Sequence, residues 1–124
     1  MAFNPQVGTT TYGVSKMAFH RLYEQLKVEV AGTGVAVGSV SPGMIHTEGL
    51  TEHRKLAANE KLPHVAYFDQ AERDGLIRPG ELAAKFILFL LTRTENDEFS
   101  QKEWKLTDES HWTRWHPDVV KNCL

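Results

Sequence analysis

A short apolar run after a long helical pattern is the feature that most constrains the fold of this chain. Residues 34–40 read Gly-Val-Ala-Val-Gly-Ser-Val, a nearly continuous series of β-branched and small residues, and Pro42 follows. Strands that are apolar on both faces are typical of the middle of a parallel sheet covered by helices. Proline ends such a strand because it has no N–H for the ladder. We therefore expect a buried parallel strand and an α/β fold.

Residues 12–30 before this strand have helical periodicity. One apolar stripe contains Val14, Met17, Ala18, Leu22 and Leu26, and a second line contains Phe19 and Tyr23. A helix that is apolar on two faces is more often buried than solvent-facing. Packing on a sheet and against another subunit accounts for the pattern, and so does one broad core face.

Tyr12 and Lys16 stand four residues apart at the start of this helix, so both side chains should lie on one face. A phenol has a pKa of about 10, and a nearby positive charge lowers that pKa. A phenol tuned in this way protonates a carbonyl oxygen or takes a proton from an alcohol. By itself the spacing more often means an exposed helix face without chemistry, just as Pro42-Gly43 by itself more often means a simple turn.

The order Tyr12-x-x-x-Lys16, helix, short apolar strand, Pro42-Gly43-x-x-x-Thr47 resembles the short-chain dehydrogenase/reductase family. The resemblance covers residues 12–47 by motif and extends more loosely to Trp104. It implies the C-terminal part of a Rossmann-like doubly wound parallel sheet that lacks the N-terminal dinucleotide-binding strands. After Thr47 the layout is most similar to small cytosolic carbonyl reductases of the benzil- or sepiapterin-reductase kind.

The resemblance also implies a chemistry. Tyr12 would be the general acid and base for hydride transfer between NADP or NAD and a small-molecule carbonyl substrate, and Lys16 would hold the nicotinamide ribose. Pro42-Gly43 ends the strand where open α/β sheets bind ligands. The cofactor-binding residues are then Lys16, Pro42, Gly43, Ile45 and Thr47. In the family this helix commonly joins a dimer interface, so we expect a homo-oligomer or pairing through residues 12–30.

We expect a single partial domain over residues 1–124: a motif-bearing helix–strand unit (1–47), a lid-like segment (48–78), a helix and last strand (79–106) and a tail (107–124). Within the lid, residues 48–60 predict one or two short helices, and 65–68 predict an apolar patch on the lid. The helix after Pro79 is apolar nearly all round, which predicts burial. Residues 98–106 alternate in part and predict the last strand.

The sequence contains no Gly-x-Gly-x-x-Gly or Gly-x-x-x-Gly-x-Gly loop to cradle a pyrophosphate. The active-site serine of the family would fall just before Met1. We therefore expect a truncated form of an NAD(P)-dependent oxidoreductase that is inactive alone. Two alternatives remain: a non-catalytic interaction module that pairs with an intact short-chain dehydrogenase, and a small helical protein with a chance motif.

The composition argues against several other classes. The 124 residues carry 14 basic and 16 acidic side chains and no basic tract, so nucleic-acid binding is not expected. The apolar run 86–91 is far shorter than the roughly 20 residues of a membrane span, and no secretory signal is visible. With Cys123 as its single cysteine, the chain is expected to be soluble and cytoplasmic.

The remaining candidate groups are better explained without a site. The six histidines form no H-E-x-x-H pattern. A metal site of His111, His116 and Cys123 is conceivable, but surface histidines on a polar tail are the expectation, with no metal bound. Trp104, Trp112 and Trp115 are expected to pack in the interior. Ser15 is interpreted as a helix residue.

Overall fold

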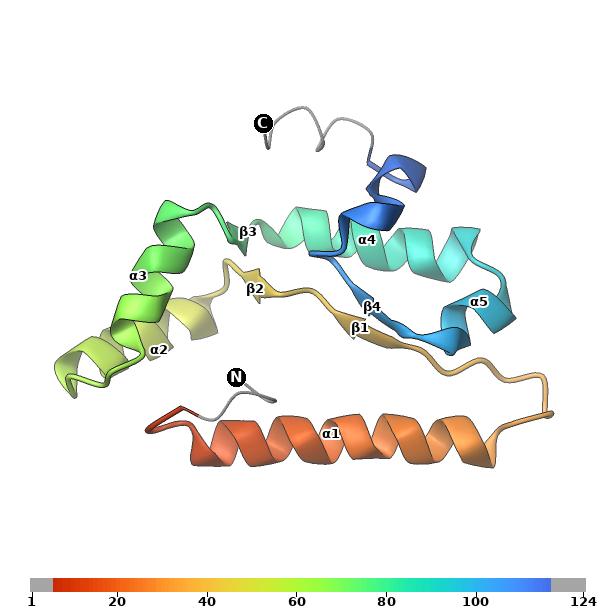
Figure 1. The fold of residues 1–124 in the computed structure, drawn as a ribbon, viewed down its shortest axis with the longest axis horizontal. Coiled ribbons are helices and arrows are strands. Elements are labelled where there is room, and N and C mark those ends of the chain that lie inside the picture. The colour runs from red at the N-terminus through yellow and green to blue at the C-terminus, as the bar shows by residue number, and fades with distance from the viewer. Residues whose placement is uncertain (1–5, 117–124) are drawn as a thin grey trace.

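The computed structural model describes residues 6–116 as helices around two short parallel strand pairs (Figure 1). The elements in chain order are α1 (Thr10–Glu29), β1 (Ser39–Ser41), β2 (Met44–Ile45), α2 (Glu48–Asn59), α3 (Val65–Arg73), β3 (Ile77–Arg78), α4 (Gly80–Arg93), α5 (Asn96–Gln101), β4 (Glu103–Lys105) and the 3₁₀ helix η1 (Glu109–Arg114). None of the helices in this part of the chain is long and apolar enough to cross a membrane.

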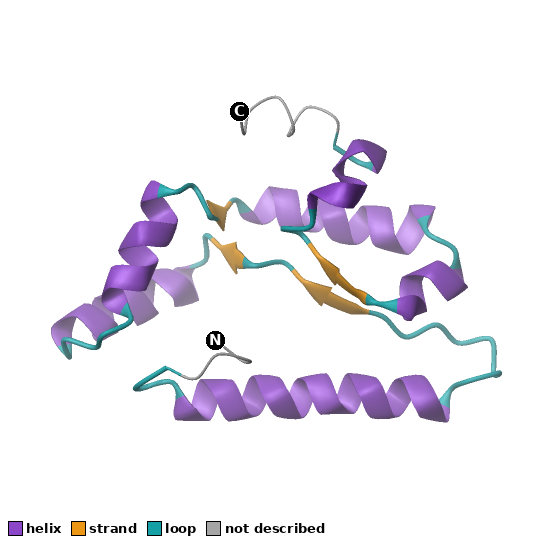
Figure 2. Cartoon of the chain, viewed as in Figure 1, coloured by secondary structure: helices purple, strands orange, loops and turns teal. Residues whose placement is uncertain are grey.

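Both strand pairs are parallel. β1 pairs with β4, with Val40 opposite Trp104, and β2 pairs with β3, with Met44 opposite Ile77. Parallel pairs need long crossovers, and here helices supply them (Figure 2). The mixed arrangement is the partial α/β fold that the sequence predicted. The strand itself is shorter than expected, because Val35–Gly38 has no neighbouring strand and only Ser39–Ser41 enters a ladder.

The core lies between α4 and the β1–β4 pair. Its buried members are Phe86, Phe89, Leu90, Trp104 and Leu106, and Val40, Ile45, Leu82, Phe99 and Trp115 pack against them. The buried Trp104 donates its indole N–H to the carbonyl of Phe99 at 3.0 Å, and Trp112 donates to Leu106 at 2.7 Å. Packing is therefore the observed role of these two tryptophans.

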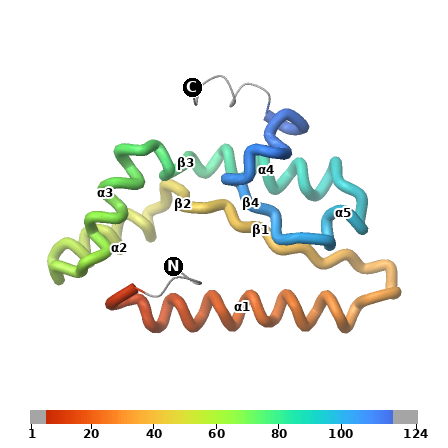
Figure 3. The backbone as a smooth tube through the Cα atoms, in the orientation of Figure 1, coloured from red at the N-terminus to blue at the C-terminus, as the bar shows by residue number. Residues whose placement is uncertain are grey.

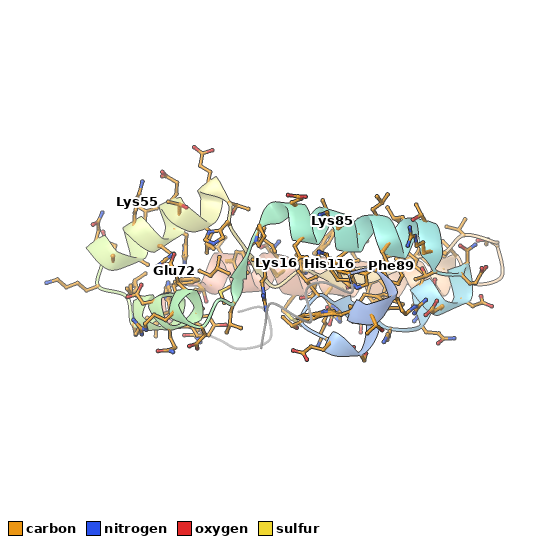
Figure 4. The ribbon with its side chains drawn as sticks, turned by 90° about the horizontal axis from the view of Figure 1, so that it is seen from above. Lys16, Lys55, Glu72, Lys85, Phe89 and His116 are labelled. Atoms are coloured by element: carbon orange, nitrogen blue, oxygen red, sulfur yellow. The ribbon has the colours of Figure 1, made fainter. Side chains whose placement is uncertain are left out.

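Only one face of α4 is buried. Ile87, Leu88 and Leu91 are exposed, so the prediction of a helix buried nearly all round is wrong. The reason is geometric: Ala83, Phe86, Phe89 and Leu90 already fill the side that meets the strands. Figure 4 labels Lys85 and Phe89, which stand one turn apart on this helix; Lys85 is exposed and Phe89 is buried.

The long helix α1 has no buried residue. It runs beside the strands as a separate rod, joined to them by the loop that follows it (Figure 3). Burial of this helix, which its two apolar lines predicted, is therefore not observed. Its exposed apolar side chains are Tyr12, Val14, Met17, Phe19, Leu22, Leu26 and Val28.

The start of α1 is attached to the α2–α3 hairpin. His64 Nδ1 lies 3.1 Å from the carbonyl oxygen of Val7. A Cβ on Gly8 would lie 3.0 Å from Leu62, so these residues are in close contact. Thr9 is buried and donates through its hydroxyl and its N–H to the carbonyl of Gln6. These contacts fix the first turn of α1.

The lid-like segment is a helical hairpin of α2 and α3, which lies at one end of the strands in Figure 1. Its apolar patch is split, because Phe68 is buried against the rings of His53 and His64 while Tyr67 is exposed. The strand predicted over residues 98–106 is also corrected: α5 precedes the short strand β4. Asp97 and Glu98 lie in the first turn of α5, where acidic side chains stabilise a helix.

Candidate functional site

Tyr12 and Lys16 lie in the first two turns of α1, on one face of the helix. Lys16 Nζ sits over the Tyr12 ring, 5.5 Å from its centroid. A cation over an exposed ring contributes roughly 0.5–1 kcal/mol. Tyr12 is about half exposed, at 50%. The nearby Ser15 donates its hydroxyl to the carbonyl of Tyr12 at 2.8 Å, as expected of a helix residue.

Pro42 and Gly43 form the turn between β1 and β2. Gly43 has φ +74, a left-handed conformation that side chains disfavour. A Cβ at this position would lie 3.6 Å from the Thr107 methyl, an ordinary contact. Glycine is thus required here by backbone conformation and not by crowding. The turn lies at the carboxyl end of β1, where the sequence placed it.

Ile45 ends β2 opposite Arg78 of β3. Its side chain packs against the core and its methyl lies 3.8 Å from the Cβ position of Gly80. The next residue, His46, donates its N–H to the carbonyl of Arg78 at 2.8 Å. The backbone at the end of β2 is therefore held by Arg78 of β3.

Thr47 is the N-cap of α2. Its side-chain oxygen accepts from the N–H of Leu50 at 3.1 Å, and its carbonyl accepts from the N–H of Thr51 at 3.1 Å. Accepting leaves the hydroxyl hydrogen of Thr47 available as a donor. Capping α2 is a sufficient structural reason for a threonine at position 47. A hydrogen bond from its hydroxyl to a ligand would be an additional role.

The predicted residues therefore form two groups on different elements. Residues 42–47 are one continuous segment at the strand ends, whereas Tyr12 and Lys16 belong to α1, whose first turn lies at the same end of the molecule as β2 (Figure 1). Within residues 6–116 no three His, Cys, Asp or Glu side chains gather as a metal site. Cys123 lies outside the described residues.

The α2–α3 hairpin carries a charged cluster that the sequence did not reveal. Arg54 Nη2 contacts Asp69 at 3.3 Å and also binds Glu72. The hydrogen bond from Arg54 lowers the pKa of Glu72, and that bond with Glu72 raises the pKa of Arg54. Arg54, Asp69 and Phe68 help to line a groove of about 300 Å³. Little in the sequence indicated this cluster, because Asp69 and Glu72 lie 15 and 18 residues after Arg54.

Histidines also pair where no motif predicted it. His53 Nε2 lies 3.2 Å from His64 Nε2, and the two rings are nearly parallel. Together with the contact to Val7, this pair joins α2 to the residues before α1. The prediction of surface histidines is wrong for His111, which is buried.

Comparison with known proteins supports the family that the motifs suggested. The short chain dehydrogenase family matches residues 1–57. Proteins named "Uncharacterized oxidoreductase" from two strains of Staphylococcus epidermidis are each 40% identical to this chain over 70 residues. The match covers 52% of this chain but 30% of each relative, and no solved structure matches. The segment that matches the short-chain dehydrogenase family, residues 1–57, therefore holds Tyr12, Lys16 and Thr47.

Proposed function

We propose that this chain carries the proton-transfer pair of an NAD(P)-dependent oxidoreductase that reduces a small carbonyl compound. The observation behind the proposal is the Tyr12–Lys16 pair, which lies on one exposed helix face inside the segment that matches the family. The curated relatives are named oxidoreductases, and the chain spans less than a third of their length. Activity, cofactor and substrate therefore all belong to the proposal.

The proposed chemistry follows from the side chains. The nicotinamide, when bound, supplies the hydride to the carbonyl carbon. Tyr12 donates its phenolic proton to the carbonyl oxygen, which gives the alcohol, and accepts that proton in the reverse reaction. The ammonium of Lys16, 5.5 Å from the centroid of the Tyr12 ring, lies beside the negative charge that proton transfer leaves on Tyr12.

The strand-end segment fits the nicotinamide end of such a cofactor. Gly43 offers backbone without a side chain, and Thr47 has a hydroxyl hydrogen to donate. Nothing comparable fits the pyrophosphate, because the 124-residue sequence has no glycine loop of either type. We therefore propose that the chain by itself binds NADPH more weakly than micromolar and is inactive alone. Micromolar binding in a fluorescence titration would contradict this.

The catalytic assignment is tested in a chimera that joins this chain to the part of a Staphylococcus relative outside the matched segment. Tyr12→Phe should abolish turnover and leave NADPH binding largely unchanged, because it removes the proton and keeps the ring. Tyr23→Phe on the same helix is the matched control and should retain turnover. Full activity of Tyr12→Phe would remove Tyr12 from the mechanism.

A second function is favoured by the exposure of α1. Phe19, Leu22 and Leu26 are 71%, 50% and 38% exposed. Their spacing of three and four residues places them on one helix face, and a contiguous apolar surface of this kind marks an interaction site. We propose that α1 pairs with the equivalent helix of an intact short-chain dehydrogenase or of a second copy. The surface needs no rearrangement to be covered, since none of the helix is buried.

The interaction is tested by light scattering and by co-purification with a full-length relative. Phe19→Glu should abolish association, because it places a charge in the exposed apolar surface of α1. Leu91→Glu is the control, since Leu91 is equally exposed on α4. A monomeric chain that captures no relative would refute this function.

A further inference from the structure

His111 is a buried histidine that the proposed function does not use. It lies in η1 with 3% of its surface exposed. Its ring stacks on Phe86, with centroids 4.9 Å apart and planes 9° apart, and meets Trp104 edge-on. The ring therefore fills part of the core between α4, β4 and η1, where water does not reach it.

The hydrogen bonds of His111 determine its protonation state. Nε2 lies 2.9 Å from the carbonyl oxygen of Lys105, and a carbonyl only accepts, so Nε2 carries the hydrogen. The indole nitrogen of Trp115 lies 3.0 Å from Nδ1, and an indole N–H only donates, so Nδ1 is bare. Both ring nitrogens are occupied and the ring is neutral.

A proton on His111 would have to go to Nδ1. There it would face the N–H of Trp115, donor against donor, and the bond between η1 and its own C-terminal tryptophan would be lost. A free imidazole takes up a proton near pH 6.5. We propose that His111 is a pH-sensitive latch, which holds Trp115 on the core when neutral and releases it when Nδ1 is protonated.

The charged groups around His111 influence the equilibrium between its neutral and protonated forms. Asp108, the N-cap of η1, carries a carboxylate that accepts from the N–H of Ser110 and interacts electrostatically with His111. The ring of His116 packs edge-on against Trp115. Four ion pairs lie on or beside the packed elements: Lys85 with Glu81, Lys102 with Asp108, Lys105 with Glu103, and Arg114 with Glu98. Glu109 of η1 and Arg93 of α4 are the remaining charged side chains on α4, β4 and η1.

Release of Trp115 would affect the carboxyl ends of the strands, because η1 is connected to them through β4. β4 continues through Leu106, whose N–H binds the carbonyl of Ser41 at 2.9 Å, into Thr107 beside Gly43. η1 starts two residues later. A change in how η1 packs would therefore act on the turn between β1 and β2, whether or not that turn binds a cofactor.

The three tryptophans provide the test, because their indole N–H groups have different acceptors. Trp115 donates to a titratable nitrogen, whereas Trp104 and Trp112 donate to backbone carbonyls. In NMR spectra of the full chain recorded from about pH 8 to pH 5, the Trp115 indole signal should move in a one-proton step while the other two stay unchanged. Simultaneous change of all three signals, or no change of Trp115, would overturn the latch.

Three variants assign the step. His111→Phe keeps a ring on Phe86 and should abolish the step, and a surviving step overturns the proposal. Asp108→Asn removes a negative charge and should lower the midpoint, so an unchanged midpoint overturns the assignment to His111. His116→Gln should leave the midpoint of the step unchanged. If the step disappeared in this variant, it would belong to His116 and the proposal would be overturned. The imidazole nitrogen shifts of the wild type give a check that needs no variant: a protonated Nδ1 at pH 8 overturns the latch.

Discussion

Gly38 is the residue at which a single methyl group should do most damage. It lies just before β1, and a Cβ there would be 2.4 Å from Cζ and 2.5 Å from Cε1 of Phe99. The ring of Phe99 has little freedom, because it packs on the core and its carbonyl binds Trp104. Gly38→Ala therefore has to displace the ring or the backbone.

The expected loss follows from two opposing effects. Overpacking of a well-filled site costs about 1–3 kcal/mol. Replacement of glycine stabilises by about 0.4–1 kcal/mol through the unfolded chain. The net change in the free energy of unfolding should thus be a loss of about 1–2 kcal/mol. The measurement is urea denaturation at pH 7 followed by tryptophan fluorescence.

Two further variants make this prediction refutable. Gly49→Ala in α2 has nothing within 4 Å of its Cβ position and should stabilise by roughly 0.5–1 kcal/mol. In a Phe99→Ala background the obstacle is absent, so Gly38→Ala should become neutral or stabilising. If Gly38→Ala is as stabilising as Gly49→Ala in the wild type, the assigned contact is wrong.

Two other predictions follow from burial and charge. Leu90→Ala should lower the free energy of unfolding by about 2–5 kcal/mol because it opens a core cavity, whereas Leu91→Ala, at an exposed position, should change it by less than about 0.5 kcal/mol; equal losses in urea denaturation would contradict the assigned faces of α4. The hydrogen bonds from Arg114 lower the pKa of Glu98. Its stabilisation is therefore complete above the unfolded pKa of about 4.3 and is lost as pH falls through the lower folded pKa. The stability difference between Glu98→Gln and the wild type should shrink on acidification, and a difference independent of pH would refute the ion pair.

The sequence predicted those parts of the fold that depend on local pattern. α1, α2 and α4 lie where the sequence placed them, and β1 ends at Ser41, just before Pro42. The features that were not predicted depend on contacts between residues far apart in the sequence. Val35–Gly38 has strand composition but no adjacent strand, and a strand without a partner has no ladder.

The candidate site divides in the same way. The common face of Tyr12 and Lys16 follows from a spacing of four residues, and the strand-end turn follows from Pro42-Gly43. The buried position of His111 depends on Phe86 of α4, 25 residues earlier in the sequence. No local pattern around His111 encodes that contact.

The two proposed functions use different parts of α1, and this separation has a structural cause. The contacts of Val7, Gly8 and Thr9 with neighbouring residues fix the first turn of the helix, and Tyr12 lies within that turn, three residues after Thr9. Phe19 and Val28 lie beyond that attachment on a rod with no buried residue. A partner that covers the far part of α1 would therefore stiffen it without moving Tyr12. Phe19→Glu should then abolish association and spare the placement of Tyr12, whereas Tyr12→Phe should do the reverse. Loss of both properties in either variant would show that the helix acts as a single unit.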